Sequence, residues 1–148
     1  MSGPTPGGEV HIRALNPAAD LAAVLELWGG AGPGVRLGAS DTPEELAKKL
    51  QRDPDLFLVA ERRGEIVGAV LGGFDGRRGL IYHLAVRPGL RRTGLGRRLM
   101  REIEDRLQAR GCLKAYLLVT RDNPQALGFY AGIGWEPMDL NLLTKVLG

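Results

Sequence analysis

Arginine and glycine residues gather in one short stretch of the chain, residues 91–97. The apolar residues 80–86 before it suit a strand, and Pro88-Gly89 ends that strand. A glycine-bearing turn between a strand and a helix N-terminus lets backbone N–H groups converge, and the helix dipole adds positive charge. The helix is indicated by apolar residues that recur every four positions, at Leu95, Leu99, Ile103 and Leu107. The stretch therefore predicts a phosphate-binding turn.

Two common phosphate-binding motifs do not fit this turn. A mononucleotide-binding loop requires Lys and then Ser or Thr after its last glycine, whereas Arg97 and Arg98 follow Gly96. A dinucleotide-binding loop requires a third glycine, and Leu99 occupies that position. The remaining candidate is an Arg-x-x-Gly-x-Gly turn of the kind that holds the pyrophosphate of coenzyme A.

A second group of residues lies further along the chain. Asn123-Pro124 is typical of a helix start, with Asn as the N-cap and Pro at the first helical position. Tyr130 ends the short helix that follows, and Gly134-Trp135 comes soon after it. The spacing predicts a short helix near the end of the chain that begins after Asn123 and ends at Tyr130, with Gly134-Trp135 beyond it.

The two groups together resemble the GNAT superfamily of N-acetyltransferases. Residues 84–88 and 91–96 are similar to its acetyl-CoA motif, and residues 123–130 are similar to its second motif. Residues 57–61 and 73–76 resemble the small bacterial YpeA-like branch. The resemblance implies an acetyl-CoA-dependent N-acetyltransferase that transfers an acetyl group directly to an amine in a ternary complex, without a metal.

The resemblance also implies roles for individual residues. Backbone groups of residues 84–86 would bind the pantetheine arm, and amides of residues 92–97 would hold the pyrophosphate. Tyr130 would be the general acid for the leaving thiolate, since the intrinsic pKa of a tyrosine lies above that of a thiol. The implied cofactor-binding residues are Leu84, Ala85, Val86, Arg91, Arg92, Thr93, Gly94, Leu95, Gly96, Arg97 and Asn123.

The motifs of this chain do not include the general base that many members of the superfamily have. Many superfamily members carry a glutamate as base on the strand predicted at residues 113–119, where this chain has Leu118. His83 is a candidate base, and the alternative is a hydrogen-bonded structural histidine. Strand alternation predicts that its side chain points away from those of Tyr82 and Leu84. The missing glutamate also favours a second interpretation, a catalytically weak acyl-CoA-binding sensor or regulatory module.

The elements that carry these residues follow from apolar periodicity and turn residues. Strands are predicted at residues 9–15, 55–61, 65–73, 80–86 and 113–119, with extended structure at 135–147. Helices are predicted at residues 17–28, 43–50, 94–110 and 124–130, and a glycine-rich loop at 29–40. The order β-α-α-β-β-β-α-β-α-β gives an α/β fold with a GNAT-like mixed sheet of about six strands and helices on both faces.

Length and composition restrict the class of protein. The 148 residues predict one acetyltransferase domain, residues 9–148, after a flexible tail at residues 1–8. A net charge of +3 and interrupting acidic residues argue against nucleic acid as a partner, so we expect a small-molecule or peptide amine. With Cys112 as the only cysteine and no membrane-spanning run, a reducing cytoplasm is favoured. The sequence leaves the acceptor amine and a homodimer open.

Overall fold

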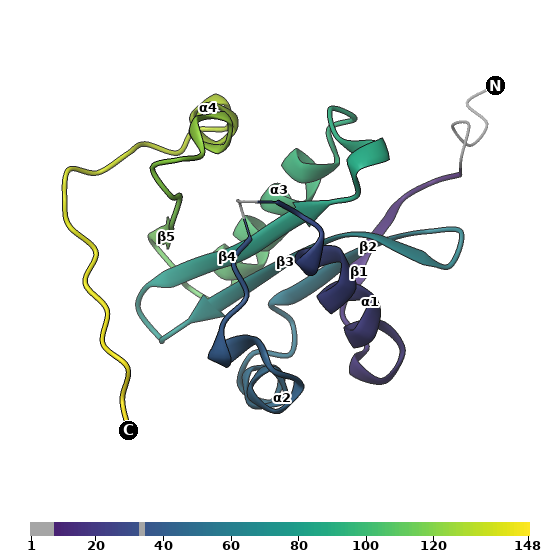
Figure 1. Ribbon diagram of the computed structural model, residues 1–148, viewed down its shortest axis with the longest axis horizontal. Coiled ribbons are helices and arrows are strands. Elements are labelled where there is room, and N and C mark those ends of the chain that lie inside the picture. Colours follow the sequence, from purple (N-terminus) through teal and green to yellow (C-terminus); the bar gives the residue numbers. More distant parts are fainter. Residues whose placement is uncertain (1–7, 33–34) are drawn as a thin grey trace.

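The computed structural model describes residues 8–32 and 35–148. One five-stranded sheet, with its strands in chain order from β1 to β5, forms the centre of the molecule (Figure 1). The strands are β1 (His11–Ala14), β2 (Phe57–Arg62), β3 (Glu65–Phe74), β4 (Gly79–Val86) and β5 (Ala115–Leu117). The α-helices are α1 (Pro17–Gly29), α2 (Pro43–Arg52), α3 (Leu95–Ala109) and α4 (Pro124–Gly132), with short 3₁₀ turns η1 (Ala39–Asp41) and η2 (Pro88–Leu90).

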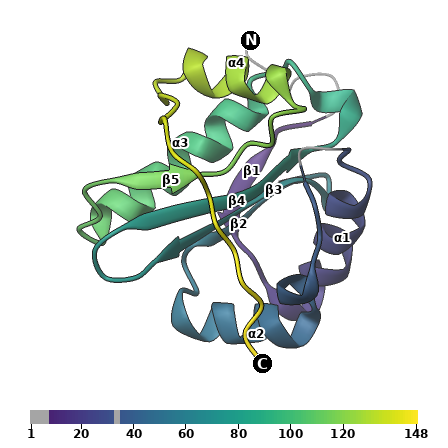
Figure 2. The same ribbon diagram turned by 60° about the vertical axis from the view of Figure 1, so that its left-hand side comes forward.

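Helices cover both faces of the sheet, as predicted. Strands β1 to β4 are antiparallel neighbours, and the crossover through α3 makes β5 parallel to β4. Figure 2 shows α1 and α2 on one side of the sheet and α3 on the other. Each face has its own buried apolar cluster, because β2 and β3 present apolar side chains to both sides. The mixed α/β fold is therefore confirmed.

Two glycines in β3 allow α3 to lie close to the sheet. A Cβ on Gly68 would come within 2.9 Å of a Leu99 methyl group, and one on Gly72 within 2.8 Å of Ile103. These helix residues lie on the face predicted from the four-residue periodicity, and both are fully buried. The close approach fixes α3, and hence the turn at its N-terminus, against the end of β4.

The start of α1 differs in detail from the prediction. Asn16 occupies the N-cap position, but its side chain makes no capping hydrogen bond. The buried carboxylate of Asp20 instead accepts the Asn16 backbone N–H at 2.8 Å and binds Arg13 through both oxygens. Arg13 also donates to Glu61 at 2.8 Å, so this charge cluster ties α1 to β1 and β2.

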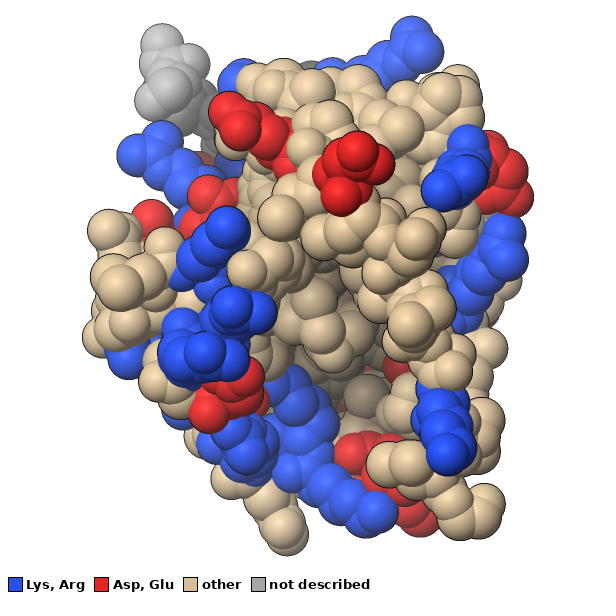
Figure 3. Space-filling model, turned by 90° about the vertical axis from the view of Figure 1, so that its left-hand side faces the viewer, with Lys and Arg blue, Asp and Glu red and all other residues tan. Residues whose placement is uncertain are grey.

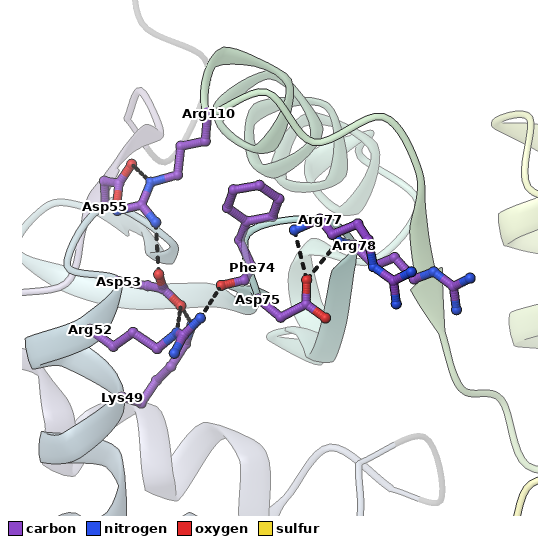
Figure 4. A network of polar contacts seen from close by, with 9 residues as sticks. All are labelled: Lys49, Arg52, Asp53, Asp55, Phe74, Asp75, Arg77, Arg78 and Arg110. Carbon is purple, nitrogen blue, oxygen red and sulfur yellow. Dashed lines mark hydrogen bonds and ion pairs between the residues drawn. The ribbon is translucent and has the colours of Figure 1, made fainter.

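A second polar network anchors α2 to the rest of the fold (Figure 4). The Asp53 carboxylate, which is only 2 % exposed, accepts hydrogen bonds from Lys49 in α2 and from Arg110 at the end of α3. Arg110 also pairs with Asp55, and Arg52 donates to the Phe74 carbonyl at the end of β3. The network therefore holds the far ends of α2, α3 and β3 together.

A β-bulge interrupts β4. Tyr82 pairs with Leu71 and Ala85 with Ala69, so β4 uses one more residue than β3 over the same span. His83 lies at the bulge with a left-handed φ of 50°. Its ring contacts the Tyr82 ring, with centroids 6.1 Å apart. The prediction that these two side chains point to opposite faces of the sheet is therefore wrong, because the extra residue of the bulge interrupts the alternation along β4.

The predicted sixth strand is also wrong. Residues 135–148 contain no helix or strand, and they run along the outside of the molecule beyond β5 (Figures 1 and 2). Strand β5 is itself only three residues long, so its outer edge offers little backbone for pairing. Pro137 removes one backbone donor, and Leu142-Leu143 breaks the apolar–polar alternation of a strand.

The remaining differences are small. The glycine-rich loop includes residues 33–34, which lie outside the described residues, and it ends in η1. Most of the predicted N-terminal tail also lies outside the described residues, since these start at Gly8. No helix in the described part of the chain is long and apolar enough to cross a membrane.

Candidate active site

The turn between β4 and α3 presents free backbone N–H groups, as predicted. The first hydrogen bond of α3 runs from the Arg98 N–H to the Gly94 carbonyl, so the three preceding amide groups have no partner within the helix. Gly94 is left-handed with a φ of 85°, and Arg92 takes the same region with a φ of 64°. The chain therefore bends sharply at both residues and directs the N-terminus of α3 outward.

The side chains of this turn add positive charge. Arg91, Arg92 and Arg97 are exposed. In the described part of the chain, neither Arg91 nor Arg92 forms an ion pair or a side-chain hydrogen bond, and Arg97 makes only a 3.5 Å contact to the Gly132 carbonyl. Thr93 instead stabilises the turn, since its hydroxyl donates to the Leu90 carbonyl. Unpaired guanidinium groups beside free amides suit a pyrophosphate.

The end of β4 has an open backbone edge. The Arg87 N–H donates to the Val67 carbonyl of β3, so the N–H and C=O of Val86 point to the opposite side, toward β5. Pairing between β4 and β5 ends at Ile81 and Leu117. Among residues 8–32 and 35–148, no strand pairs with Val86 on that side, and an extended ligand could do so.

Helix α4 brings the second predicted motif to the same place. A Cβ on Gly96 would lie 3.4 Å from the Phe129 ring and 3.8 Å from a Val86 methyl group. Phe129 of α4 therefore lies beside Gly96 at the N-terminus of α3, and Gly96 in turn lies beside Val86 at the end of β4. Asn123 is the N-cap of α4, as predicted, and its Oδ1 accepts the Ala126 N–H at 3.2 Å. Its amide nitrogen makes no hydrogen bond to any described residue and so has donors free for a ligand.

Tyr130 lies next to Phe129 on α4 and is largely enclosed. Its ring makes an edge contact with Phe129, at 5.1 Å between centroids, and a second with Trp135 at 6.4 Å. The ring packs against the cluster beneath α3. Burial raises the pKa of Tyr130 to about 12. The hydroxyl therefore stays protonated at neutral pH, as a general acid requires.

A large cavity of about 1170 Å³ lies on the other side of Tyr130. It is lined by β5, α3, α4 and the C-terminal segment, and contains none of residues 84–97. Figure 3 shows this face, where mostly uncharged side chains surround the hollow and charged side chains of both signs lie at its borders. Leu118 lines the cavity and is 56 % exposed. The turn residues are therefore not part of the cavity lining, although α3 and α4 both extend from the turn region to the cavity.

His83 lies on the opposite face of the sheet. Its Nε2 is 2.9 Å from Asp41 Oδ1, and its ring meets the edge of Trp28 with centroids 4.9 Å apart. Trp28 belongs to the apolar cluster beneath α1 and α2. The sequence did not indicate Asp41 as a partner of His83. The two residues are 42 positions apart, and no local pattern links a loop aspartate to a distant strand.

Comparisons with known proteins agree on one family. The profile of the Acetyltransferase (GNAT) family matches residues 21–135. An acetyltransferase of Pectobacterium atrosepticum is 43 % identical over 129 residues, which cover 86 % of this chain and 89 % of that protein. An acetyltransferase of Yersinia enterocolitica is 43 % identical over 139 residues, covering 93 % and 96 %.

Solved structures share the fold. The PaiA N-acetyltransferase of Thermoplasma acidophilum, solved in complex with coenzyme A, superposes with a TM-score of 0.77 at 21 % identity and covers 90 % of this chain and 93 % of its own. Ard1 of Thermoplasma volcanium superposes with a TM-score of 0.73 at 25 % identity, covering 84 % and 81 %. The profile match and the two bacterial relatives show that this chain belongs to the GNAT family of acetyltransferases.

Proposed function

We propose that this protein transfers an acetyl group from acetyl-CoA directly to an amine. The observation that carries the proposal is the meeting of three separate features: the open edge of β4 at Val86, the free amides at the start of α3, and α4 with Tyr130. A strand edge can hold an extended amide-containing arm, and a helix N-terminus can hold a pyrophosphate. Coenzyme A has both parts in that order.

In this proposal each group of residues has a distinct task. In the segment Leu84, Ala85 and Val86, the backbone groups that face the open edge, those of Val86 among them, bind the pantetheine arm as a further strand would. Amides of residues 92–97 hold the pyrophosphate, and Arg91 and Arg97 add charge. Asn123 donates to the pantetheine side from the start of α4. These contacts place the thioester near the bulge of β4, where the strands part.

Tyr130 and His83 then carry the proton transfers. The acceptor nitrogen bonds to the acetyl carbonyl carbon while the C–S bond breaks, and the Tyr130 hydroxyl protonates the leaving sulfur. His83 takes the proton released by the nitrogen. No enzyme nucleophile is needed, because the amine attacks the thioester itself.

The acceptor is proposed only as a class, an amine. One structural neighbour is the aminoglycoside N-acetyltransferase AAC(6')-Iy in complex with the bisubstrate analogue CoA-S-monomethyl-acetylneamine, and another is the glucosamine-6-phosphate N-acetyltransferase of Arabidopsis thaliana. Both superpose at under 25 % identity, so they support the fold and not an acceptor. Small amines, amino acids and peptide N-termini all belong in the test.

The test is a thiol-release assay with acetyl-CoA and a panel of these amines. Release of free coenzyme A that depends on both enzyme and amine, with an acetylated product of the expected mass, supports the proposal. Tight acetyl-CoA binding without turnover of any amine would favour the alternative, an acyl-CoA-binding sensor or regulatory module. The observation behind that alternative is the absence of a carboxylate at exposed Leu118.

A further inference from the structure

We propose that Asp41 positions His83 as the general base for the acceptor amine, so that the α1–α2 loop completes the active site. The proposal rests on the acetyl-transfer function proposed above and adds a residue from a different part of the chain. The observation that supports the proposal is the pairing of the Asp41 carboxylate with the His83 imidazole, both of them largely buried. The Asp41 side chain is 9 % exposed, that of His83 is 16 % exposed, and the two are 2.9 Å apart.

The pair fixes the tautomer of the imidazole. An ionised carboxylate only accepts hydrogen bonds, so His83 donates from Nε2 to Asp41 Oδ1. In the neutral ring the lone pair then lies on Nδ1, which forms no hydrogen bond with any described residue. A histidine held by a carboxylate on one nitrogen and free on the other has the arrangement required of a general base.

The carboxylate is itself held in place. Its second oxygen, Oδ2, accepts the Gly38 backbone N–H at 2.8 Å. This hydrogen bond closes η1 and directs Oδ1 toward the sheet. Asp41 thus has one oxygen for its own loop and one for His83, which prevents its side chain from rotating away. Residues of the α1–α2 loop thereby determine the orientation of a ring on β4.

The backbone of β4 places the ring on this face. In a regular strand His83 and Tyr82 would lie on opposite sides, but at the bulge their ring centroids are 6.1 Å apart, and the His83 ring contacts Trp28 of α1. The left-handed φ of 50° at His83 is uncommon for a residue with a Cβ. The neighbouring Trp28 Nε1 is buried without a hydrogen-bond partner among the described residues. Unfavourable backbone and polar features concentrated around one histidine are typical of a functional site.

His83 also lies at the right point along β4. It directly precedes residues 84–86, whose backbone binds the pantetheine arm in the proposed function. Tyr130 packs on the α3 face of the sheet, whereas His83 contacts Trp28 on the α1 face. The acid and the base therefore come from opposite sides of the sheet, and the acceptor enters from the side of the α1–α2 loop.

The proton balance of the step is complete. The acceptor nitrogen gives one proton to His83 Nδ1 as the N–C bond forms, and the sulfur takes one from Tyr130 as the C–S bond breaks. A proton returned from His83 to the tyrosinate through solvent restores both groups. Asp41 stays ionised and stabilises the imidazolium throughout.

The first test needs no acceptor. The chain has two histidines, and the exposed His11 is an internal control. Long-range ¹H–¹⁵N correlation spectra of the labelled full-length protein report which ring nitrogen carries the proton. We expect neutral His83 to be protonated on Nε2 alone, and D41N to lose this preference. Protonation of His83 on Nδ1, or a tautomer mixture like that of His11 in the unmodified protein, would overturn the proposal.

The second test distinguishes a catalytic role of the Asp41–His83 pair from a purely structural role in holding the α1–α2 loop. Asp41 and Tyr82 are the titratable groups in contact with His83, so D41N, H83Q and Y82F are compared, with His11→Gln as the control variant. We expect H83Q to lower kcat about 100-fold and D41N about 10-fold, with the KM for acetyl-CoA changed less than about twofold. The defects should grow with the basicity of the amine, since a more basic amine arrives protonated and must first give an additional proton to His83, which releases it to solvent before the transfer step.

A purely structural ion pair gives a different result. Loss of thermal stability in D41N, with kcat unchanged for the folded fraction at every amine basicity, would contradict the proposal. Failure of the underlying function is seen separately, as absence of acetyl-CoA binding by the unmodified protein in calorimetry. The tautomer experiment does not depend on that binding, so the two failures are distinguishable.

Discussion

Tyr130 and His83 differ in how the chain prepares them for proton transfer. Tyr130 packs among apolar side chains, and burial raises its pKa to about 12, so its hydroxyl keeps its proton at neutral pH. His83 is paired with a carboxylate and exposes part of its ring. The spacing between Asn123 and Tyr130 predicted that one short helix starts after the first and carries the second, and α4 confirms this. The environment of His83 depends on a loop that meets the strand only after folding.

Replacing Tyr130 with Phe removes the proposed acid and leaves the ring. We expect Y130F to lower kcat by about 10- to 100-fold while the Kd for acetyl-CoA changes less than about twofold, since the hydroxyl acts on the leaving group and not on the bound cofactor. Steady-state kinetics and calorimetry measure the two effects. Y116F, on β5, is the matched control and should retain both values. An equal loss of turnover and affinity in Y130F would remove Tyr130 from the acid role.

Arg92 has a backbone conformation in the turn that favours glycine. Its φ of 64° is left-handed, which costs a residue with a Cβ about 1 kcal/mol relative to glycine. We expect R92G to raise Tm by a few degrees, whereas R91G, at a φ of −65°, should lower it. Thermal unfolding of both variants measures the difference. A lower Tm for R92G than for R91G would show that the Arg92 side chain stabilises the turn.

At the scale of elements, local sequence patterns predicted those features that depend on residues close together in the chain. The buried face of α3 and the N-caps of α2 and α4 follow from periodicity and from capping residues close to the helix. The β4 bulge, the Asp20 contact with Asn16 and the Asp41–His83 pair were not predictable, because each depends on register or on a loop position. The prediction of a sixth strand was wrong for a related reason. An extended segment forms a strand only where a neighbouring strand offers enough backbone for pairing, and β5 has three residues.

The charge cluster at the start of α1 makes stability depend on pH. Arg13 lowers the pKa of Asp20 below the unfolded value of about 3.8, so the folded state favours the ionised carboxylate. This stabilisation is fully present above the unfolded pKa and is lost as the pH falls through the folded pKa. We expect D20N to cost about 2 kcal/mol at pH 7 and to flatten the loss of stability below pH 4.

Urea unfolding at a series of pH values measures this linkage. The control is D105N, because Asp105 is an exposed carboxylate on α3. D105N should unfold as the unmodified protein does across the range. If D20N and the unmodified protein lose stability in parallel between pH 5 and pH 3, the Arg13–Asp20 pair is not the source of the acid sensitivity.

At the scale of the whole molecule, the C-terminal segment leaves large apolar side chains uncovered. Leu143, Val146 and Leu147 are each almost fully exposed, and the cavity of about 1170 Å³ lies between this segment and β5. A monomer rarely leaves such an apolar surface in contact with water. A second copy offers a matching segment and cavity, so contacts across a two-fold axis would cover both surfaces at once.

We therefore expect the protein to form a homodimer through residues 138–147. Light scattering after size-exclusion chromatography should give twice the chain mass of 16.0 kDa. The double variant L143D/V146D should give the monomer mass, while R121A, at the border of the cavity, should not change the assembly. A monomer mass for the unmodified protein at high micromolar concentration would contradict this expectation.

The proposed acetyl transfer depends on binding of acetyl-CoA at the turn after Val86. The most direct measurement is a calorimetric titration of the unmodified protein with acetyl-CoA and, in parallel, with S-acetylpantetheine, which lacks the pyrophosphate. We predict saturable one-to-one binding of acetyl-CoA, at least about tenfold weaker binding of S-acetylpantetheine, and loss of that difference in R91A/R97A. No binding heat with acetyl-CoA at millimolar concentration, or equal affinity for the two ligands, would contradict the assignment of this turn.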